Sequence, residues 1–168
     1  MTEITTYLAL GTNLGYKKKN LEEAILLLNK EVGSTTKISP VYTAVSMGFE
    51  GFDFYNCCIE FQTCLKPLEL LDKCKAIEQK MGRVKTISEG YENRVIDIDI
   101  IFYSNEVFHS KLLNIPHKEA LNRSFVLCPL ADIAPTFIDP VSGISIKEAA
   151  SKLGNELIIA KSEIKLFG

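Results

Sequence analysis

The order in which two kinds of hydrophobic pattern follow one another most constrains the fold of this chain. Short apolar or alternating runs are typical of strands, and they occur at residues 4–10, 36–46, 54–63 and 94–103. Apolar residues recur at helical spacing in two intervening segments, 16–31 and 66–82. The order strand–helix–strand–strand–helix–strand is that of split βαβ sheets. We therefore predict an α+β fold with a ferredoxin-like βαββαβ core.

The residues after this core predict further elements of the same domain. We expect a short return strand within 104–108, a helix near 145–154 and an added edge strand in the tail, 157–168. No linker-like or low-complexity stretch separates them from the core, and 168 residues suffice for one ordinary hydrophobic core. We therefore expect residues 1–168 to form a single domain with extra C-terminal elements.

Composition limits the partners and the compartment. The net charge of −2 gives no general attraction to nucleic acid or to anionic membranes, and we expect neither as a partner. The N-terminal residues do not resemble a signal peptide, and no apolar run reaches the roughly 18 residues of a membrane span. The five cysteines are odd in number and form no CxxC, which predicts reduced thiols, no metal–thiolate site and a cytoplasmic protein.

Two aspartates interrupt the apolar run "NRVIDIDIIFY" at residues 93–103. Side chains alternate along a strand, so Asp97 and Asp99 should share one face, about 6.6 Å apart. Two such carboxylates can converge on one magnesium ion or hold two ions, and hard oxygen ligands favour Mg²⁺ over zinc. The alternative is a solvated pair on an exposed strand face, because a DxD sequence is short and common.

Cationic side chains lie on both sides of this pair in the sequence. They are Lys80, Arg83, Lys85 and Arg94 upstream, and His117, Lys118 and Arg123 downstream. Each alone could be a solvated or structural side chain, but together they favour a magnesium-dependent polyphosphate site. The chain has no Walker A sequence, and the glycines of "GTNLG" at residues 11–15 have the wrong spacing for one. We predict that "GTNLG" is a turn between the first strand and the first helix.

Aromatic side chains cluster around the third strand. Most of them should pack in the core, but Phe49 and Phe52 lie in a glycine-containing loop where a flat ring system could be sandwiched. Asn56, in the strand that follows, could hold such a ring through paired amide hydrogen bonds.

Several of these stretches together resemble a known enzyme family. R-x-x-D-[ILV]-D at residues 94–99, followed by P-H-x-x-x-x-x-R-x-F at 116–125, is a specific combination, and "LALGTNLG" and "FYNCCIEFQT" accompany it. From about residue 4 to residue 137 the chain is similar to the 6-hydroxymethyl-7,8-dihydropterin pyrophosphokinases of folate biosynthesis. The resemblance implies a three-layer αβα fold. It also implies transfer of pyrophosphate from ATP, the co-substrate, to the pterin hydroxymethyl group, leaving AMP.

The resemblance also implies roles for individual residues. The catalytic residues would be Arg83, Arg94, Asp97 and Asp99, with two magnesium ions on the two aspartates. The residues binding ATP would be Lys85, His117, Lys118 and Arg123. The residues binding the pterin would be Ala44, Val45, Phe54, Asn56, Tyr91 and Phe125. Phe54 and Phe125 would sandwich its ring, and the loops 44–53 and 83–93 would close over both substrates. A monomer suffices for this site.

The sequence departs from the family pattern in its loops. Tyr91-Glu92-Asn93 stands where the family has a tryptophan and then Gly-Pro, Lys85 replaces an arginine, and Ala44-Val45-Ser46 replaces Thr-Pro-Pro. Lysine cannot make the planar two-pronged contact of arginine, so these changes concern loop closure more than the reaction. Two other interpretations are another magnesium-dependent nucleotidyl- or phosphotransferase on such a sheet, and a non-catalytic module that binds a small ligand.

Overall fold

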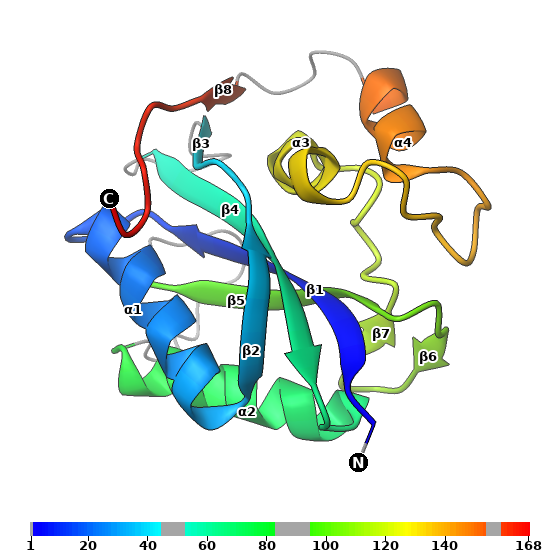
Figure 1. The fold of residues 1–168 in the computed structure, drawn as a ribbon, viewed down its shortest axis with the longest axis horizontal. Helices are drawn as coiled ribbons and strands as arrows, with labels where there is room; N and C mark the ends of the chain where they lie inside the picture. The colour runs from blue at the N-terminus through cyan, green and yellow to red at the C-terminus, as the bar shows by residue number, and fades with distance from the viewer. Residues whose placement is uncertain (1, 45–52, 83–94, 154–158) are drawn as a thin grey trace.

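The computed structural model describes residues 2–44, 53–82, 95–153 and 159–168, drawn in colour in Figure 1. Its first half contains β1 (Ile4–Thr12), α1 (Lys17–Glu31), β2 (Gly33–Ile38), β3 (Tyr42–Ala44), β4 (Phe54–Thr63) and α2 (Pro67–Lys80). Its second half contains β5 (Asp97–Tyr103), β6 (Phe108–His109), β7 (Asn114–Ile115), α3 (Ser124–Ile133), α4 (Ile146–Leu153) and β8 (Ile159–Lys161).

The main sheet has the strand order β5-β1-β4-β3-β8, and β2 also pairs with β4. Its pairs are antiparallel, with β1 and β4 at the centre. Since α1 connects β1 to β2 and α2 connects β4 to β5, the predicted βαββαβ core is confirmed. The predicted edge strand of the tail is also confirmed, because β8 pairs with β3.

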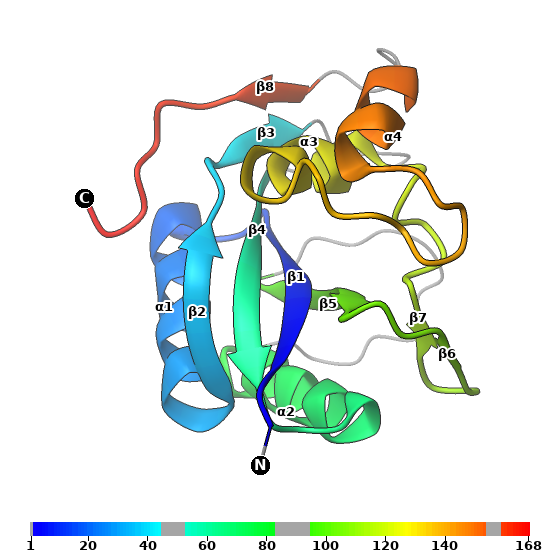
Figure 2. The same ribbon diagram turned by 45° about the vertical axis from the view of Figure 1, so that its right-hand side comes forward.

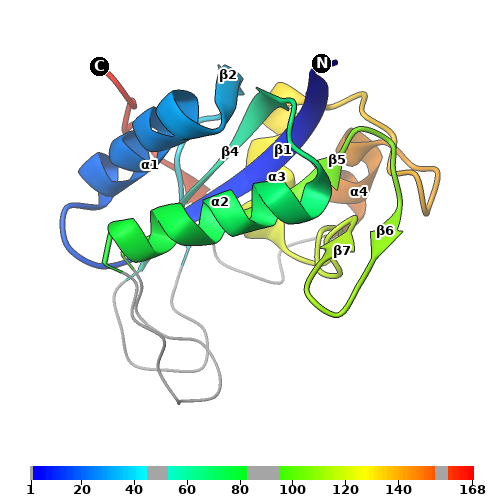
Figure 3. The same cartoon turned by 90° about the horizontal axis from the view of Figure 1, so that it is seen from below.

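Helices cover both faces of the sheet and give the three layers of an αβα fold. In Figures 1 and 2, α1 and α2 lie on one side of the strands, and α3 and α4 lie on the other. Seen from below in Figure 3, α2 crosses in front of β1 and β4. Each side has a separate cluster of buried apolar residues: Leu8, Leu10, Ile25, Leu28, Leu70, Ile77, Ile98 and Ile100 on the α1–α2 side, and Tyr7, Cys58, Ile101, Phe102, Val126, Leu127 and Leu130 on the α3–α4 side.

The face on which each β5 side chain lies follows from its pairing with β1. Ile98 and Ile100 pack in the core under α1 and α2, so the half-buried Asp97 and Asp99 point to the opposite face, as predicted. The register shifts between Tyr7 and Leu8, which leaves Ile101 as an extra residue in β5. This bulge explains why Ile101 and Phe102, although adjacent, pack in the same core.

The predicted single strand at 36–46 is wrong. The structure has β2 and β3 there, separated by Ser39–Val41. Pro40 has no N–H to donate to a ladder, and Ser39 bonds to the backbone of Cys58 instead: its N–H donates to the Cys58 carbonyl and its Oγ accepts from the Cys58 N–H, both at 2.9 Å. The break allows β2 and β3 to pair with opposite ends of β4.

Two other predictions need correction, and one helix was not predicted. The return strand expected within 104–108 is instead β6, which pairs with β7 and not with the main sheet, because the chain turns away at Ser104 (φ 48°). The segment "GTNLG" is not wholly a turn, since Gly11 and Thr12 belong to β1. Helix α3 was not among the predicted elements; Pro129 lies inside it, although proline is rare inside helices.

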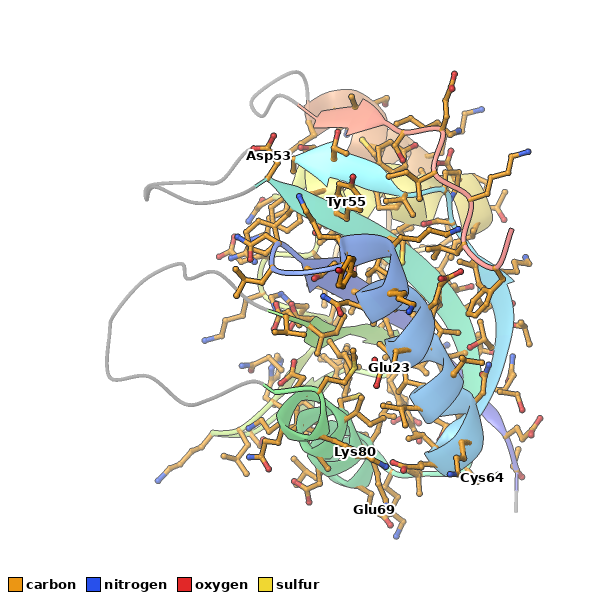
Figure 4. The ribbon with its side chains drawn as sticks, turned by 90° about the vertical axis from the view of Figure 1, so that its left-hand side faces the viewer. Glu23, Asp53, Tyr55, Cys64, Glu69 and Lys80 are labelled. Atoms are coloured by element: carbon orange, nitrogen blue, oxygen red, sulfur yellow. The ribbon has the colours of Figure 1, made fainter. Side chains whose placement is uncertain are left out.

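None of the five cysteines forms a disulfide in the structure. Cys57, Cys58 and Cys74 are buried, and burial raises the pKa of the Cys57 and Cys74 thiols to about 12. Cys64 is exposed just after β4, at the end opposite to Asp53 and Tyr55 (Figure 4). Across the described parts of the chain, no helix combines the length and apolar character needed to cross a bilayer.

Candidate active site

Three neighbouring strands bring predicted site residues into adjacent positions. Gly11 of β1 pairs with Asp97 of β5 on one side and with Asn56 of β4 on the other. Two residues along β1, Ala9 pairs in the same way with Asp99 and Cys58. Because side chains alternate, these two rows occupy the face of the sheet that α3 covers. The two carboxylates therefore share a sheet face with the buried amide of Asn56.

A cavity of about 500 Å³ runs along β5 beside the aspartates. Its lining includes the predicted residues Asp97, Asp99, His117, Lys118 and Arg123. Lys75 of α2 and Lys111 add two cations, and Leu71, Leu112 and Leu113 add apolar surface. The structure thus collects residues from α2, β5 and the segment before α3 around one concave site, which suits an anionic ligand with an apolar part.

His117 is held by its backbone and by one ring nitrogen. Its N–H donates to the Ile101 carbonyl at 3.0 Å, and its Nδ1 lies 3.1 Å from the Glu119 N–H. Since Nδ1 accepts that bond, the proton of a neutral ring lies on Nε2. Burial lowers the pKa of His117, and the charge of Arg123 lowers it further, against the opposing effects of Asp97 and Glu119. A neutral His117 can therefore donate one hydrogen bond from Nε2.

Arg123 lies at the start of α3, next to an aromatic ring. Its Cζ is 5.6 Å from the ring centroid of Phe125, within the range of a cation–π contact. Phe125 is half-buried against the core on the α3–α4 side. Since Arg123 also lines the cavity, this contact holds a cation at the junction between the cavity and α3.

The described pterin-binding candidates on β3 and β4 do not line this cavity, although they lie on neighbouring strands of the same sheet. Ala44 pairs with Phe54, and Tyr42 pairs with Asn56. Asn56 is 6% exposed, and its Nδ2 makes no hydrogen bond. A buried donor without a partner costs about 1–3 kcal/mol, so Asn56 is better suited to a bound ligand than to the structure as it stands.

Tyr55 lies on the other face of β4. The ammonium group of Lys17, in α1, is 4.6 Å from the centre of the Tyr55 ring. The same group donates to the Asp53 carbonyl at 3.1 Å. Figure 4 shows Asp53 and Tyr55 close together near the end of this strand. The contact with α1 confirms that Tyr55 points away from Phe54 and Asn56, which belong to the face under α3.

Glu78 of α2 lines the cavity, and the sequence reasoning did not identify it. Its side chain is 7% exposed, and its Oε2 accepts a 2.7 Å hydrogen bond from the Ile98 N–H, between the two aspartates. The available signal was an acid one position after Ile77, on the apolar stripe of a predicted helix. A buried carboxylate is costly without a partner, and this bond to an edge strand provides one.

Several predicted site residues cannot be placed. Val45, Arg83, Lys85, Tyr91 and Arg94 lie outside the described residues, as do most of the two predicted loops.

The donor set fits magnesium better than zinc. In the described ranges, no group of three or more His, Cys, Asp or Glu side chains could hold a metal. Two half-buried carboxylates next to several cations suit an ion that keeps waters and shares its coordination with substrate phosphates, as Mg²⁺ does.

Comparisons with known proteins agree with this geometry. Residues 7–135 match the family model for 7,8-dihydro-6-hydroxymethylpterin-pyrophosphokinase (HPPK). The 2-amino-4-hydroxy-6-hydroxymethyldihydropteridine pyrophosphokinase of Aquifex aeolicus is 39% identical over 145 residues, covering 86% of this chain and 89% of that protein. The Bacillus subtilis protein of the same name is 36% identical over 129 residues, covering 76% of each.

Other similar proteins are longer. A folic acid synthesis protein of Pneumocystis carinii is 40% identical over 148 residues, which cover 88% of this chain but only 20% of that protein. The chain thus spans about a fifth of such relatives. The crystal structure of wild-type Plasmodium falciparum HPPK-DHPS with pteroate has a TM-score of 0.75 at 18% identity, covering 90% of this chain and 44% of that one, and supports the fold.

Proposed function

The chain belongs to the 7,8-dihydro-6-hydroxymethylpterin-pyrophosphokinase family, and we propose that it transfers pyrophosphate from ATP to 6-hydroxymethyl-7,8-dihydropterin. The products are the pterin diphosphate and AMP, and the step belongs to folate biosynthesis. One observation carries the proposal beyond the family match. The carboxylate of Asp97 and the unpartnered amide of Asn56 flank the same glycine on one sheet face, which suits a phosphate site beside a ring site.

ATP would occupy the cavity along β5. Lys118, Arg123 and the Nε2–H of His117 would bind its phosphates, with Lys75 and Lys111 adding positive charge. Leu71 and Leu112 offer apolar surface for the base. Arg83, Arg94 and Lys85 remain candidates for further phosphate contacts on the strength of the family resemblance.

Asp97 and Asp99 would hold magnesium, and we propose two ions. Their shared sheet face and the nearby cations support this assignment. When bound there, Mg²⁺ supplies positive charge that offsets the charge of the phosphate oxygens during transfer.

The pterin would lie at the other end of the site. Phe54 and Phe125 would stack on its two faces, and the Asn56 amide would bind its edge, which would satisfy the unpartnered Nδ2. Ala44, Val45 and Tyr91 would complete this end of the site.

The reaction is an in-line displacement at the β-phosphorus of ATP. The pterin hydroxyl oxygen forms the new bond to that phosphorus, the bond from the β-phosphorus to the oxygen bridging it to the α-phosphorus breaks, and AMP leaves with that oxygen. The hydroxyl proton passes to solvent, and we assign no side-chain base. The protein contributes by positioning both substrates and by placing cations around the phosphates.

Other properties belong to the same proposal. Both apolar cores share one sheet, which supports a single domain over residues 1–168. We also propose a functional monomer and a cytoplasmic location; the lack of disulfides among the five cysteines supports the second.

The nucleotide product tests the proposal. Wild-type protein mixed with ATP, magnesium and 6-hydroxymethyl-7,8-dihydropterin should release AMP, measured by chromatography of the nucleotides. Asp97→Ala should lower the rate at least about 100-fold, because it removes charge stabilisation at the reacting phosphates. Asp72→Ala, on the exposed face of α2, is the matched control. ADP as the product would refute the pyrophosphokinase assignment and favour another phosphotransferase.

A further inference from the structure

Gly11 occupies an unusual place for a glycine. It lies near the end of β1, in the middle of the sheet, and it is buried. Glycine inside a strand weakens it, and in such a place it often marks a close approach by another group. Its backbone is not in the left-handed region, so a turn does not explain it. The explanation must lie in what surrounds the missing side chain.

The missing side chain leaves room for Asn56. A Cβ added at Gly11 would lie 3.0 Å from the Oδ1 of Asn56 and 3.8 Å from the Cδ1 of Phe54. The second distance is an ordinary contact, but the first is tighter than most Cβ contacts, so the amide would have to shift by a few tenths of an ångström. The carboxamide of Asn56 therefore lies close against the position that a Cβ at residue 11 would occupy.

The neighbouring row shows that this requirement is local. Ala9 lies two residues earlier on the same face of β1, between Asp99 and Cys58. The strand accepts a methyl group there, where its partner on β4 carries a thiol. A glycine stands in the row where the partner is the amide with an unpartnered Nδ2. The two rows thus differ in the β1 residue: alanine stands opposite the thiol, and glycine stands opposite the amide that would bind a ring and needs space.

We propose that Gly11 is a positioning residue for the pterin. By lacking a side chain, it leaves room for the Asn56 carboxamide close to β1, in the row that also holds Asp97, with Nδ2 left for the substrate. Gly11 acts through Asn56 and does not touch the reacting atoms. The inference rests on the proposed function, because it takes a pterin as the ligand of Asn56.

Gly11→Ala tests the proposal by separating the two substrates. Steady-state rates should show a KM for the pterin raised about tenfold, the size expected when one buried hydrogen bond is lost. The KM for ATP should stay within about twofold, and AMP should remain the product. Gly143→Ala is the control: it makes the same change at a site with φ +77° and nothing within 4 Å of the added Cβ, so it strains the backbone without filling the site. It should leave both KM values unchanged.

A double-mutant cycle shows whether the effect runs through Asn56. Asn56→Ala removes the oxygen that the new methyl would meet, so Gly11→Ala should add little to its effect on the KM for the pterin. Additive effects, an unchanged KM for the pterin or an equal rise in both KM values would overturn the proposal. If Gly11→Ala does not fold, the double variant should fold, and its failure would also count against the inference.

The controls separate this inference from the function on which it rests. A wild-type protein that releases no AMP refutes the proposed function. A wild-type protein that releases AMP, with a Gly11→Ala variant that binds pterin normally, refutes only the role of Gly11.

Discussion

Charges of both signs act on the pKa of His117, and burial has the largest effect on it. The ring is half-buried, and the positive charge of Arg123 and the negative charges of Asp97 and Glu119 act on it. Burial and Arg123 together outweigh the carboxylates and lower its pKa. At neutral pH the ring is therefore neutral and can donate one hydrogen bond from Nε2, beside the cationic side chains of Lys118 and Arg123 in the cavity lining.

This lowered pKa predicts a pH dependence of stability. The unfolded chain takes up a proton on His117 near its ordinary pKa of 6.5, whereas the folded chain does so only at lower pH. The contribution to stability is thus fully present above pH 6.5 and is lost as the pH falls toward the lowered value. Urea denaturation between pH 7.5 and 5.5 should show a steeper loss for wild type than for His117→Gln. The difference should be at most about 1.4 kcal/mol per pH unit, the limit for one proton. Equal slopes would contradict the prediction.

At the scale of elements, β5 is an edge strand, and a side chain of α2 accepts one of its outward-facing backbone hydrogen bonds. An edge strand leaves every second N–H without a neighbouring strand, and at Ile98 the Glu78 carboxylate accepts that hydrogen bond. The bond fixes the backbone between Asp97 and Asp99. Because the three carboxylates line one cavity, Glu78 also adds negative charge close to the proposed magnesium ions.

Removing this bond should affect both stability and magnesium binding. Glu78→Ala leaves the Ile98 N–H without its partner, and we expect a loss of about 2 kcal/mol in the free energy of unfolding. It should also raise the magnesium concentration needed for half-maximal activity. Glu78→Gln keeps an acceptor oxygen and should lose less stability.

Asp72→Ala, on the exposed face of the same helix, is the control and should change stability by less than about 0.5 kcal/mol. Urea denaturation and magnesium titration measure both effects. A Glu78→Ala variant as stable as Asp72→Ala would show that the bond contributes nothing.

Elements with a local cause could be predicted from the sequence. The spacing of Leu21, Ile25 and Leu28 specifies α1, and β4 has the predicted bounds. Two misses have causes far away in the sequence. The break between β2 and β3 depends on Ser39 bonding to Cys58, and the contact of Glu78 with Ile98 joins residues 20 apart. A pattern read along the chain does not contain such partners.

The site was predictable in its chemistry but not in its packing. The pair of aspartates, His117 and Arg123 form a recognisable set, and the fold brings them to one cavity. The role of Gly11 depends on which residue lies opposite it in β4, and the sequence alone does not give that register. The lysines at 75 and 111 come from different elements, and their shared cavity follows from tertiary structure.

At the scale of the whole molecule, the central sheet couples the site to both cores. The strands that carry Asp97, Gly11 and Asn56 pack against α1 and α2 on one face and against α3 on the other. Both cores must therefore be intact for the carboxylates, the cations and the amide to stay in register. A ligand that needs this arrangement should stabilise the molecule as a unit, because it binds the folded chain and not the unfolded one.

A non-hydrolysable ATP analogue should therefore raise the thermal unfolding midpoint, and should need magnesium to do so. At 100 times its dissociation constant the analogue adds about 2.7 kcal/mol, which should shift Tm by roughly 5–10 °C in a chain of this size. Differential scanning calorimetry should find most of this shift lost in EDTA and in Asp97→Ala, since both remove the charge that links the phosphates to β5. Asp72→Ala should keep it. An equal shift without magnesium would mean that the nucleotide binds through the cations alone, and Asp97 and Asp99 would then not hold the metal.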